Sequence, residues 1–271
     1  MSHGPQPGPQ TGQQTADRLA ALRAEVKKIE GAAVAGEAGF MPLGIAQVDA
    51  CIAGGGLAVR ALHEVSAASP DVADDAAATL FLAALAGLRS RDVAGAQGDV
   101  LWALARRDLF APGLALAGLT PDRLLYAECR NDEEVLAVME EGLRHGGLAA
   151  VVGEVGRCAM APARRLQLAA EEGGTTALML RRWKKAARDP LVEPSPAVTR
   201  WRVACAPSAP LPFDSSEPVA GLGRARWHVD LARQRGGEPQ HWILEAPDAE
   251  ARFALFSPAR DRPDQAGRRA A

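Results

Sequence analysis

Apolar residues recur along the middle of the chain in short continuous runs, with longer amphipathic segments between them. Short apolar runs are typical of strands buried on both faces of a parallel sheet, and apolar spacings of three and four residues are typical of covering helices. Single helices between such strands require right-handed crossovers, so the pattern predicts an α/β fold with a mostly parallel sheet flanked by helices. The expected strands are 62–65, 100–105, 124–128, 148–152, 176–180 and 199–205, and the expected helices are 74–91, 114–119, 131–145 and 161–172.

The last third of the chain alternates apolar and polar residues. Residues 226–233 and 241–245 show this alternation on either side of a glycine-containing turn at 234–238. The pattern predicts a C-terminal antiparallel hairpin with Trp227, Val229 and Leu231 on one face.

The composition divides the chain into five parts. The first is rich in Gly, Pro and Gln and too polar to pack, and the last is a charged tail that we expect to be mobile. The parts are a disordered N-terminus (1–15), an amphipathic helix and linker (16–36), the core (37–206), the hairpin extension (207–256) and the tail (257–271).

The amphipathic helix carries an apolar stripe with two open interpretations. A short helix gains its stability from the surface that it covers, so the stripe can dock on the chain's own core or on another protein. Its residues are Leu19, Leu22, Val26 and Ile29.

Charge and cysteine content exclude several classes of function. The 31 Lys and Arg residues against 33 Asp and Glu residues give a net charge of −2, so no global basic field draws the chain to nucleic acid or anionic lipid. The four cysteines are far apart and have no metal-ligand spacing, which indicates reduced thiols and no resident metal. No apolar run reaches the length of a membrane span, and no signal peptide is recognisable, so we expect a cytoplasmic protein.

Residues 62–75 read as a strand, a loop and the start of a helix, which is the setting of a phosphate-binding loop. The glycines, Lys and Ser/Thr of such a loop are missing from their places, and Asp71, Asp74 and Asp75 mark the helix start instead. Carboxylates at a helix N-terminus complement its dipole from within the protein and disfavour a bound phosphate. The triplet 54–56 is followed by no Lys-Ser/Thr pair, so we interpret it as a turn.

The order of these segments resembles the RecA-like core and, more closely, the ImuA family of RecA-related accessory proteins in bacterial error-prone lesion bypass. No single one of these segments is specific to the family, but their order along the chain is. The segments that carry the resemblance are 42–49, 54–57, 62–65, 124–155, 199–203 and the Arg-Gly-Gly turn at 235–237.

The resemblance implies where the parts of an ATPase site would fall, and this chain departs from all of them. The phosphate loop would lie at 66–75. The magnesium-holding acid would align with Gly153, whereas Glu154 is one step on, and one step along a strand turns a side chain to the other face. Arg106 and Arg107 stand where the catalytic glutamate would follow its strand. We therefore predict no ATPase activity, no catalytic residues and no cofactor.

Other catalytic interpretations are weaker. His63 and Glu64 are neighbours on a strand and point to opposite faces. His145 suits the capping of a helix C-terminus, and Cys158 has no partner His at a readable spacing. His228 and His241 can face each other across the hairpin, but two ligands do not make a metal site.

A basic stretch after the strand 176–180 is the strongest binding candidate. It leaves the carboxyl edge of the sheet, where open α/β sheets place their sites, and the resemblance implies a mobile loop that touches single-stranded DNA. Its five cations would neutralise phosphates while the indole stacks on a base. The alternatives are an acidic partner protein or a solvated surface. The residues are Arg181, Arg182, Trp183, Lys184, Lys185 and Arg188.

The resemblance also implies a function and partners. It implies a non-catalytic scaffold of SOS-induced translesion synthesis after DNA damage, a mutagenic branch of DNA repair. The scaffold would link ImuB and, through ImuB, an error-prone C-family polymerase. The helix 16–30 would dock on another RecA-fold subunit, either a second copy or RecA itself, and Trp242 or His241 of the hairpin would anchor ImuB. The alternatives are an ATP-dependent recombinase and a SulA-like cell-division inhibitor.

Overall fold

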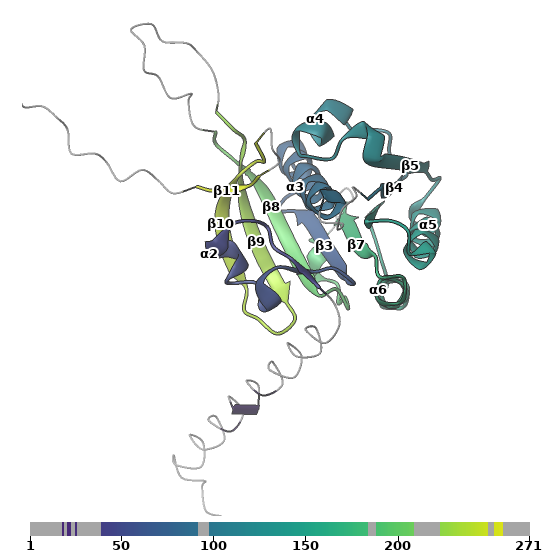
Figure 1. The fold of residues 1–271 in the computed structure, drawn as a ribbon, viewed down its shortest axis with the longest axis horizontal. Coiled ribbons are helices and arrows are strands. Elements are labelled where there is room, and N and C mark those ends of the chain that lie inside the picture. The colour runs from purple at the N-terminus through teal and green to yellow at the C-terminus, as the bar shows by residue number, and fades with distance from the viewer. Residues whose placement is uncertain are drawn as a thin grey trace, which may run out of the picture.

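The described residues build a nine-stranded mixed sheet with helices on both faces (Figure 1). The computed structural model describes residues 18, 21, 22, 25, 39–91, 98–183, 188–208, 223–248 and 252–256. In chain order the elements are β1 (Phe40–Met41), α2 (Ala46–Asp49), η1 (Ala53–Gly55), β2 (Leu57–Ala58), β3 (Leu62–Ala67), α3 (Val72–Arg91), β4 (Val100–Leu104), α4 (Ala111–Leu116), η2 (Pro121–Arg123), β5 (Leu124–Glu128), α5 (Asp132–His145), β6 (Ala150–Val155), α6 (Met160–Gly173), β7 (Thr176–Arg181), η3 (Pro190–Val192), β8 (Thr199–Ala206), β9 (Arg226–Gln234), β10 (Gln240–Glu245) and β11 (Ala254–Leu255).

The strand order is β11-β10-β9-β8-β3-β7-β6-β4-β5. Strands β8, β3, β7, β6, β4 and β5 run parallel to their neighbours in this series, whereas β9, β10 and β11 are antiparallel. Strand β8 joins the two parts, since it pairs parallel with β3 and antiparallel with β9. The predicted α/β fold with a mostly parallel sheet and a C-terminal antiparallel hairpin is confirmed.

The two faces of the sheet carry separate apolar cores. Alternation along β6 sends Val152 to the core under α3 and α4, and Val151 to the core under α5 and α6. In Figure 1, α5 and α6 lie together on one side of the parallel strands, and α3 and α4 lie together away from them. Successive residues along a strand therefore face different cores, one under α3 and α4 and the other under α5 and α6.

An aromatic cluster ties the hairpin to α3. The ring of Phe81 lies 5.6 Å from Trp201, 6.2 Å from Trp227 and 5.9 Å from Phe253, measured between ring centroids. The predicted hairpin face is also confirmed, because Trp227, Val229 and Leu231 are all buried. The hairpin strands thus extend the same sheet and share its core.

Helix ends follow the expected chemistry. The Asn131 side chain caps α5 by accepting a hydrogen bond from the Glu134 amide at 2.9 Å. At the other end Gly146 adopts a left-handed conformation with φ of 70°, after the terminal His145. At the triplet, Gly54 and Gly55 have φ of 83° and 79°, as a tight turn requires.

Strand β6 extends further than the sequence pattern indicates. The predicted strand was 148–152, whereas β6 spans Ala150–Val155 and includes Gly153 and Glu154. All six residues are buried and pair with β7, and the first four also pair with β4, so a glycine and a charge do not end the strand. A Cβ at position 153 would lie 2.1 Å from Met139 Sδ, which explains the glycine.

The N-terminal helix is only partly within the described residues. Arg18, Ala21, Leu22 and Glu25 are helical, and the Leu22 side chain is exposed. Leu19, Val26 and Ile29 lie outside the described residues. Among the helices that the structure describes, none is long and apolar enough to cross a bilayer.

The register of β6 can be tested with Gly153→Ala. We expect the added methyl group to clash with Met139 on α5 and lower the free energy of unfolding by about 1–3 kcal/mol, measured by urea denaturation. Gly39→Ala is the matched control, because nothing lies within 4 Å of its added Cβ. Equal stability of the two variants would contradict the register.

Candidate functional site at the carboxyl edge of the sheet

The carboxyl ends of β3, β6 and β7 meet the first turn of α3 at one edge of the sheet. Open α/β sheets bind their ligands at this edge. The side chains gathered here come from segments more than a hundred residues apart, such as Asp75 of α3 and Arg182 after β7. Their contacts decide which chemistry the edge can support.

Acidic side chains organise the start of α3. The Asp71 carboxylate accepts a hydrogen bond from the Ala73 amide at 2.8 Å and so caps the helix. Asp74 accepts from Ser69 Oγ at 2.6 Å and from the Cys205 amide at 2.8 Å, which ties the loop to β8. The expectation that Asp71, Asp74 and Asp75 form the helix start is met, because Asp71 caps the helix and the other two lie in its first turn. Asp74 also binds the neighbouring strand.

Arg182 occupies the space between α3 and the end of β6. Its guanidinium donates to Glu154 Oε2 from Nε at 3.0 Å and from Nη2 at 2.8 Å. Nη1 donates to Thr79 Oγ1 at 3.1 Å and to the carboxylate of Asp75. The residue is only 7% exposed. Burial alone would lower the pKa of Arg182, but the two carboxylates outweigh it and raise that pKa above its ordinary value.

Glu154 faces α3, which corrects the inference from sequence. The expected alignment put the acidic position at Gly153 and turned Glu154 to the other face. In the structure the added Cβ of Gly153 would meet α5, and Glu154 accepts a 2.7 Å hydrogen bond from Trp102 Nε1 on the α3 side. Burial raises the pKa of the Glu154 carboxyl despite the contact with Arg182. Glu154 therefore sits beside the helix start, already paired.

Arg181 points to the opposite face of the sheet and has its own buried partners. Its Nη1 donates to Glu64 Oε1 at 3.1 Å and its Nη2 donates to Glu193 Oε2 at 2.9 Å. Glu64 also accepts from Arg200 Nε at 2.7 Å and from Ser195 Oγ at 2.8 Å. Two successive arginines are thus neutralised separately, one on each face.

This geometry corrects the basic-loop prediction in part. Arg181 is 1% exposed, and neither it nor Arg182 can offer its guanidinium to a DNA phosphate without breaking buried ion pairs. The Trp183 ring packs on the core, and its Nε1 donates to the Ala67 carbonyl at 2.8 Å. Arg188 is exposed.

Lys184 and Lys185 lie outside the described residues. Contact of this basic stretch with DNA stays a prediction, and the cations left to make it are Lys184, Lys185 and Arg188.

The two arginines in place of a catalytic glutamate lie in solvent. Arg106 pairs with Asp108, and Arg107 Nη2 lies 2.5 Å from Glu128 Oε2. Both side chains are largely exposed, so these surface pairs contribute little to stability.

The surroundings of the buried His63 and Cys158 indicate structural roles for both residues. The His63 ring lies between Thr199 Oγ1 at 2.7 Å and the Ala58 carbonyl at 2.9 Å, and burial lowers its pKa to about 4. Burial raises the pKa of the Cys158 thiol to about 11, which leaves it protonated and unreactive.

The hairpin residues are held within the fold. The rings of His228 and His241 stack 5.6 Å apart, and His241 Nδ1 contacts the Asp230 carboxylate. No group of three or more potential metal ligands occurs within the described residues. Trp242 is half-buried, with its ring centroid 6.3 Å from that of Trp201, so its role as a partner anchor stays a prediction.

The sequence reasoning missed the buried acids that neutralise these arginines. Glu64 stands in the middle of an apolar strand and Glu154 at the end of another. A charged residue inside a buried strand needs a partner, and that signal was present in the sequence. That signal does not say which cation pairs with each of these two glutamates.

Comparison with known proteins found relatives of one name. The "Protein ImuA" of Caulobacter vibrioides, strain NA1000 / CB15N, is 38% identical over 214 residues, which cover 77% of this chain and 84% of that protein. The protein of the same name from strain ATCC 19089 / CIP 103742 / CB 15 matches equally. No family model matches the chain.

Among solved structures, SulA from Pseudomonas aeruginosa is 24% identical, with a TM-score of 0.36, over 44% of this chain and 95% of that one.

The buried pairing can be tested with Arg182→Met. Losing the guanidinium leaves Glu154 buried without its cation, which we expect to cost about 3–5 kcal/mol of unfolding free energy. A carboxyl whose pKa is raised by folding favours the folded state when protonated, and this contribution is lost as the pH rises through that raised pKa. The deficit measured by urea denaturation should therefore be larger at pH 8 than at pH 5.

The double variant Arg182→Met/Glu154→Gln should regain much of the loss and its pH dependence. Arg106→Met is the control for a solvent-exposed arginine. A deficit that is the same at both pH values and in the double variant would contradict the assignment.

Proposed function

The chain belongs to the ImuA family, which has an accessory role in the SOS mutasome, and we propose that it acts there as a non-catalytic scaffold. In this proposal it binds ImuB and, through ImuB, an error-prone C-family polymerase during synthesis across damaged template bases. RecA is a further partner, reached through the apolar stripe that includes Leu22, which is exposed.

The observation that carries the non-catalytic part is the position of Arg182. Phosphoryl transfer depends on positioning phosphates and neutralising their charge, usually with a metal ion held by acidic side chains. Here the acids at the start of α3 and the end of β6 already bind a guanidinium supplied by the chain itself. Asp71 and Asp74 add negative charge at the same helix terminus, which disfavours phosphate.

The same contacts suit a scaffold. The two buried networks join β3, β6, β7, β8 and α3 through side chains that cannot separate without exposing an unpaired buried charge. A rigid frame holds its partner surfaces in a fixed arrangement, and a preorganised surface loses little entropy on binding.

Single-stranded DNA remains part of the proposal through Lys184, Lys185 and Arg188. Arg181 and Arg182 are excluded from it because they are neutralised within the fold.

The scaffold proposal predicts binding that is independent of nucleotide. Purified chain should retain the ImuB-family protein of its own organism equally with and without ATP and Mg²⁺. ATP should leave the melting temperature unchanged, because only a ligand that binds the folded state raises it. Leu22→Asp should weaken retention of RecA and leave ImuB binding intact.

Two results would reject the proposal. ATP turnover that is abolished by Glu154→Gln would favour the recombinase alternative. Retention of a tubulin-like division protein in place of the ImuB-family protein would favour the SulA-like alternative.

The DNA component predicts a specific salt dependence. Each phosphate contact on a single strand contributes about 0.7 to the slope of log K against log salt, so changing Lys184, Lys185 and Arg188 to Ala should reduce that slope by about 2. Fluorescence anisotropy with a labelled oligonucleotide measures this. Arg164→Ala, at an exposed position on α6, is the control. An unchanged slope removes the loop from any DNA interface.

A further inference from the structure

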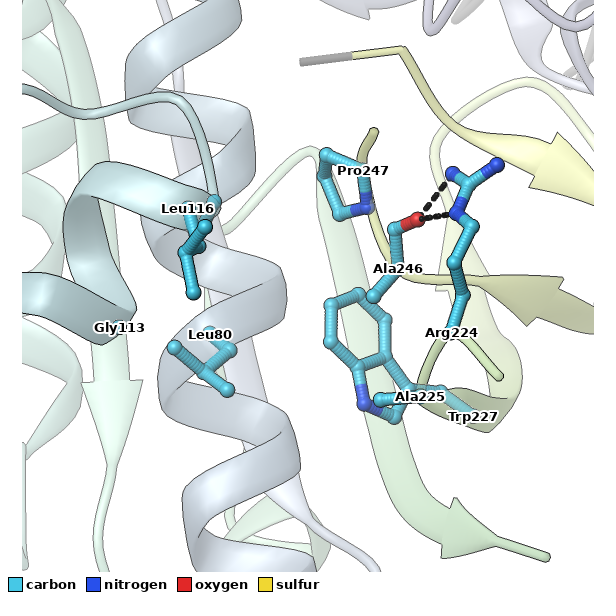
Figure 2. A pocket seen from close by; sticks show the side chains of 9 residues that line it. Leu80, Gly113, Leu116, Arg224, Ala225, Trp227, Ala246 and Pro247 are labelled. Carbon is cyan, nitrogen blue, oxygen red and sulfur yellow. Dashed lines mark hydrogen bonds between the residues drawn. The ribbon is translucent and has the colours of Figure 1, made fainter. Parts of the chain in front are cut away.

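A pocket lies between the helices α3 and α4 and the C-terminal hairpin. Its volume is about 240 Å³. Figure 2 shows Leu80 and Leu116 on the helical side, facing Trp227, Ala246 and Pro247 across the opening. The lining is almost entirely apolar, and the one charged residue in it is Arg224.

Small residues create this space. Gly113 on α4 and Ala117 just after it line one side, and Ala225 and Ala246 line the hairpin side. None of these four side chains is larger than a methyl group. Leu116 beside them is largely exposed, whereas Trp227, which also lines the pocket, is only 2% exposed. The pocket therefore has room for one large apolar side chain from outside.

Exposed apolar residues continue from the pocket along the surface. Leu116 is 73% exposed and Phe110 is 70% exposed. A Cβ built on Gly113 would lie 3.3 Å from Phe110 and 3.5 Å from Leu80, so these side chains gather around α4. Exposed apolar residues that occur singly are normal, but a contiguous group beside a pocket marks an interaction surface.

The charge at the rim is positive. Arg224 donates to the Ala246 carbonyl from Nε at 2.8 Å, and its Nη1 reaches Glu245 only at 3.9 Å. Glu245 is shared with Arg226 at 3.0 Å, and Asp248 pairs with Arg252. Among the residues that the structure describes here, three arginines thus face two carboxylates, which leaves an excess of one positive charge.

We propose that this groove, formed by Leu80, Leu116, Trp227 and Pro247 with Arg224 at its rim, is a docking site for a segment of a partner protein. The segment inserts one large apolar side chain between Leu116 and Trp227 and sets a carboxylate against Arg224. The inference rests on the proposed function, in which the partner is the ImuB-family protein. Charge complementarity at the rim selects an acidic-apolar segment over a basic one.

The test uses the full chain and the ImuB-family protein of the same organism, with affinity measured by biolayer interferometry. Leu116→Glu should weaken binding by roughly tenfold or more, because it places an unpaired charge at the centre of the contact. Leu168→Glu is the matched control: Leu168 is 55% exposed on α6, on the opposite face, and its change should leave affinity unaltered. Both leucines are exposed, so neither substitution should unfold the chain.

Arg224→Gln keeps hydrogen-bond donors for the Ala246 carbonyl and removes the charge. It should weaken binding by a few-fold and make the affinity less dependent on salt. Equal affinity of wild type and Leu116→Glu would overturn the docking proposal while leaving the scaffold function standing. If Leu116→Glu alters only self-association, the occupant is a second copy and the proposal is also overturned. A wild-type chain that does not bind at all rejects the proposed function itself.

Discussion

The pairing of two successive arginines with buried glutamates, on opposite faces of one sheet, is the constraint on which the carboxyl edge depends. Arg181 and Glu64 lie on the face of α5 and α6, and Arg182 and Glu154 lie on the face of α3. An unpaired charge in a protein interior costs several kcal/mol, so neither arginine can leave unless its partner is neutralised. The constraint therefore fixes the ends of three strands and the first turns of α3 relative to one another.

This constraint decides what the edge can do. A nucleotide site must present unpaired positive charge and an accessible acid to an incoming phosphate and metal. Here Glu154 stands beside α3, where an acid of that kind would be useful, but its oxygens are taken by Trp102 and Arg182. The edge resembles a ligand site whose charges have been balanced internally, and such an arrangement favours stiffness over exchange of a ligand.

The sequence predicted most of the fold because its signals are local. Apolar runs located the buried parallel strands, Asn131 located the start of α5, and alternation placed Trp227 on the inner face of the hairpin. The site could not be predicted in the same way. Arg181 and Arg182 end an apolar run and so look like a basic loop, although Arg181 is the last residue of β7. Their partners lie 117 and 28 residues away at Glu64 and Glu154, and no local pattern in one sequence joins them.

The hairpin has a consequence beyond completing the sheet. Its inner face enters the core through Trp227 against Phe81, while Arg224 and Ala225, just before β9, line an unfilled space beside α4. Larger side chains at Gly113, Ala225 or Ala246 would close that space with the chain's own atoms, as protein interiors ordinarily do. Small residues along this opening give up dispersion contacts that larger side chains would make there. A side chain of a partner protein can make those dispersion contacts. The opening between α4 and the hairpin is therefore a place where association can complete packing that the folded chain leaves incomplete.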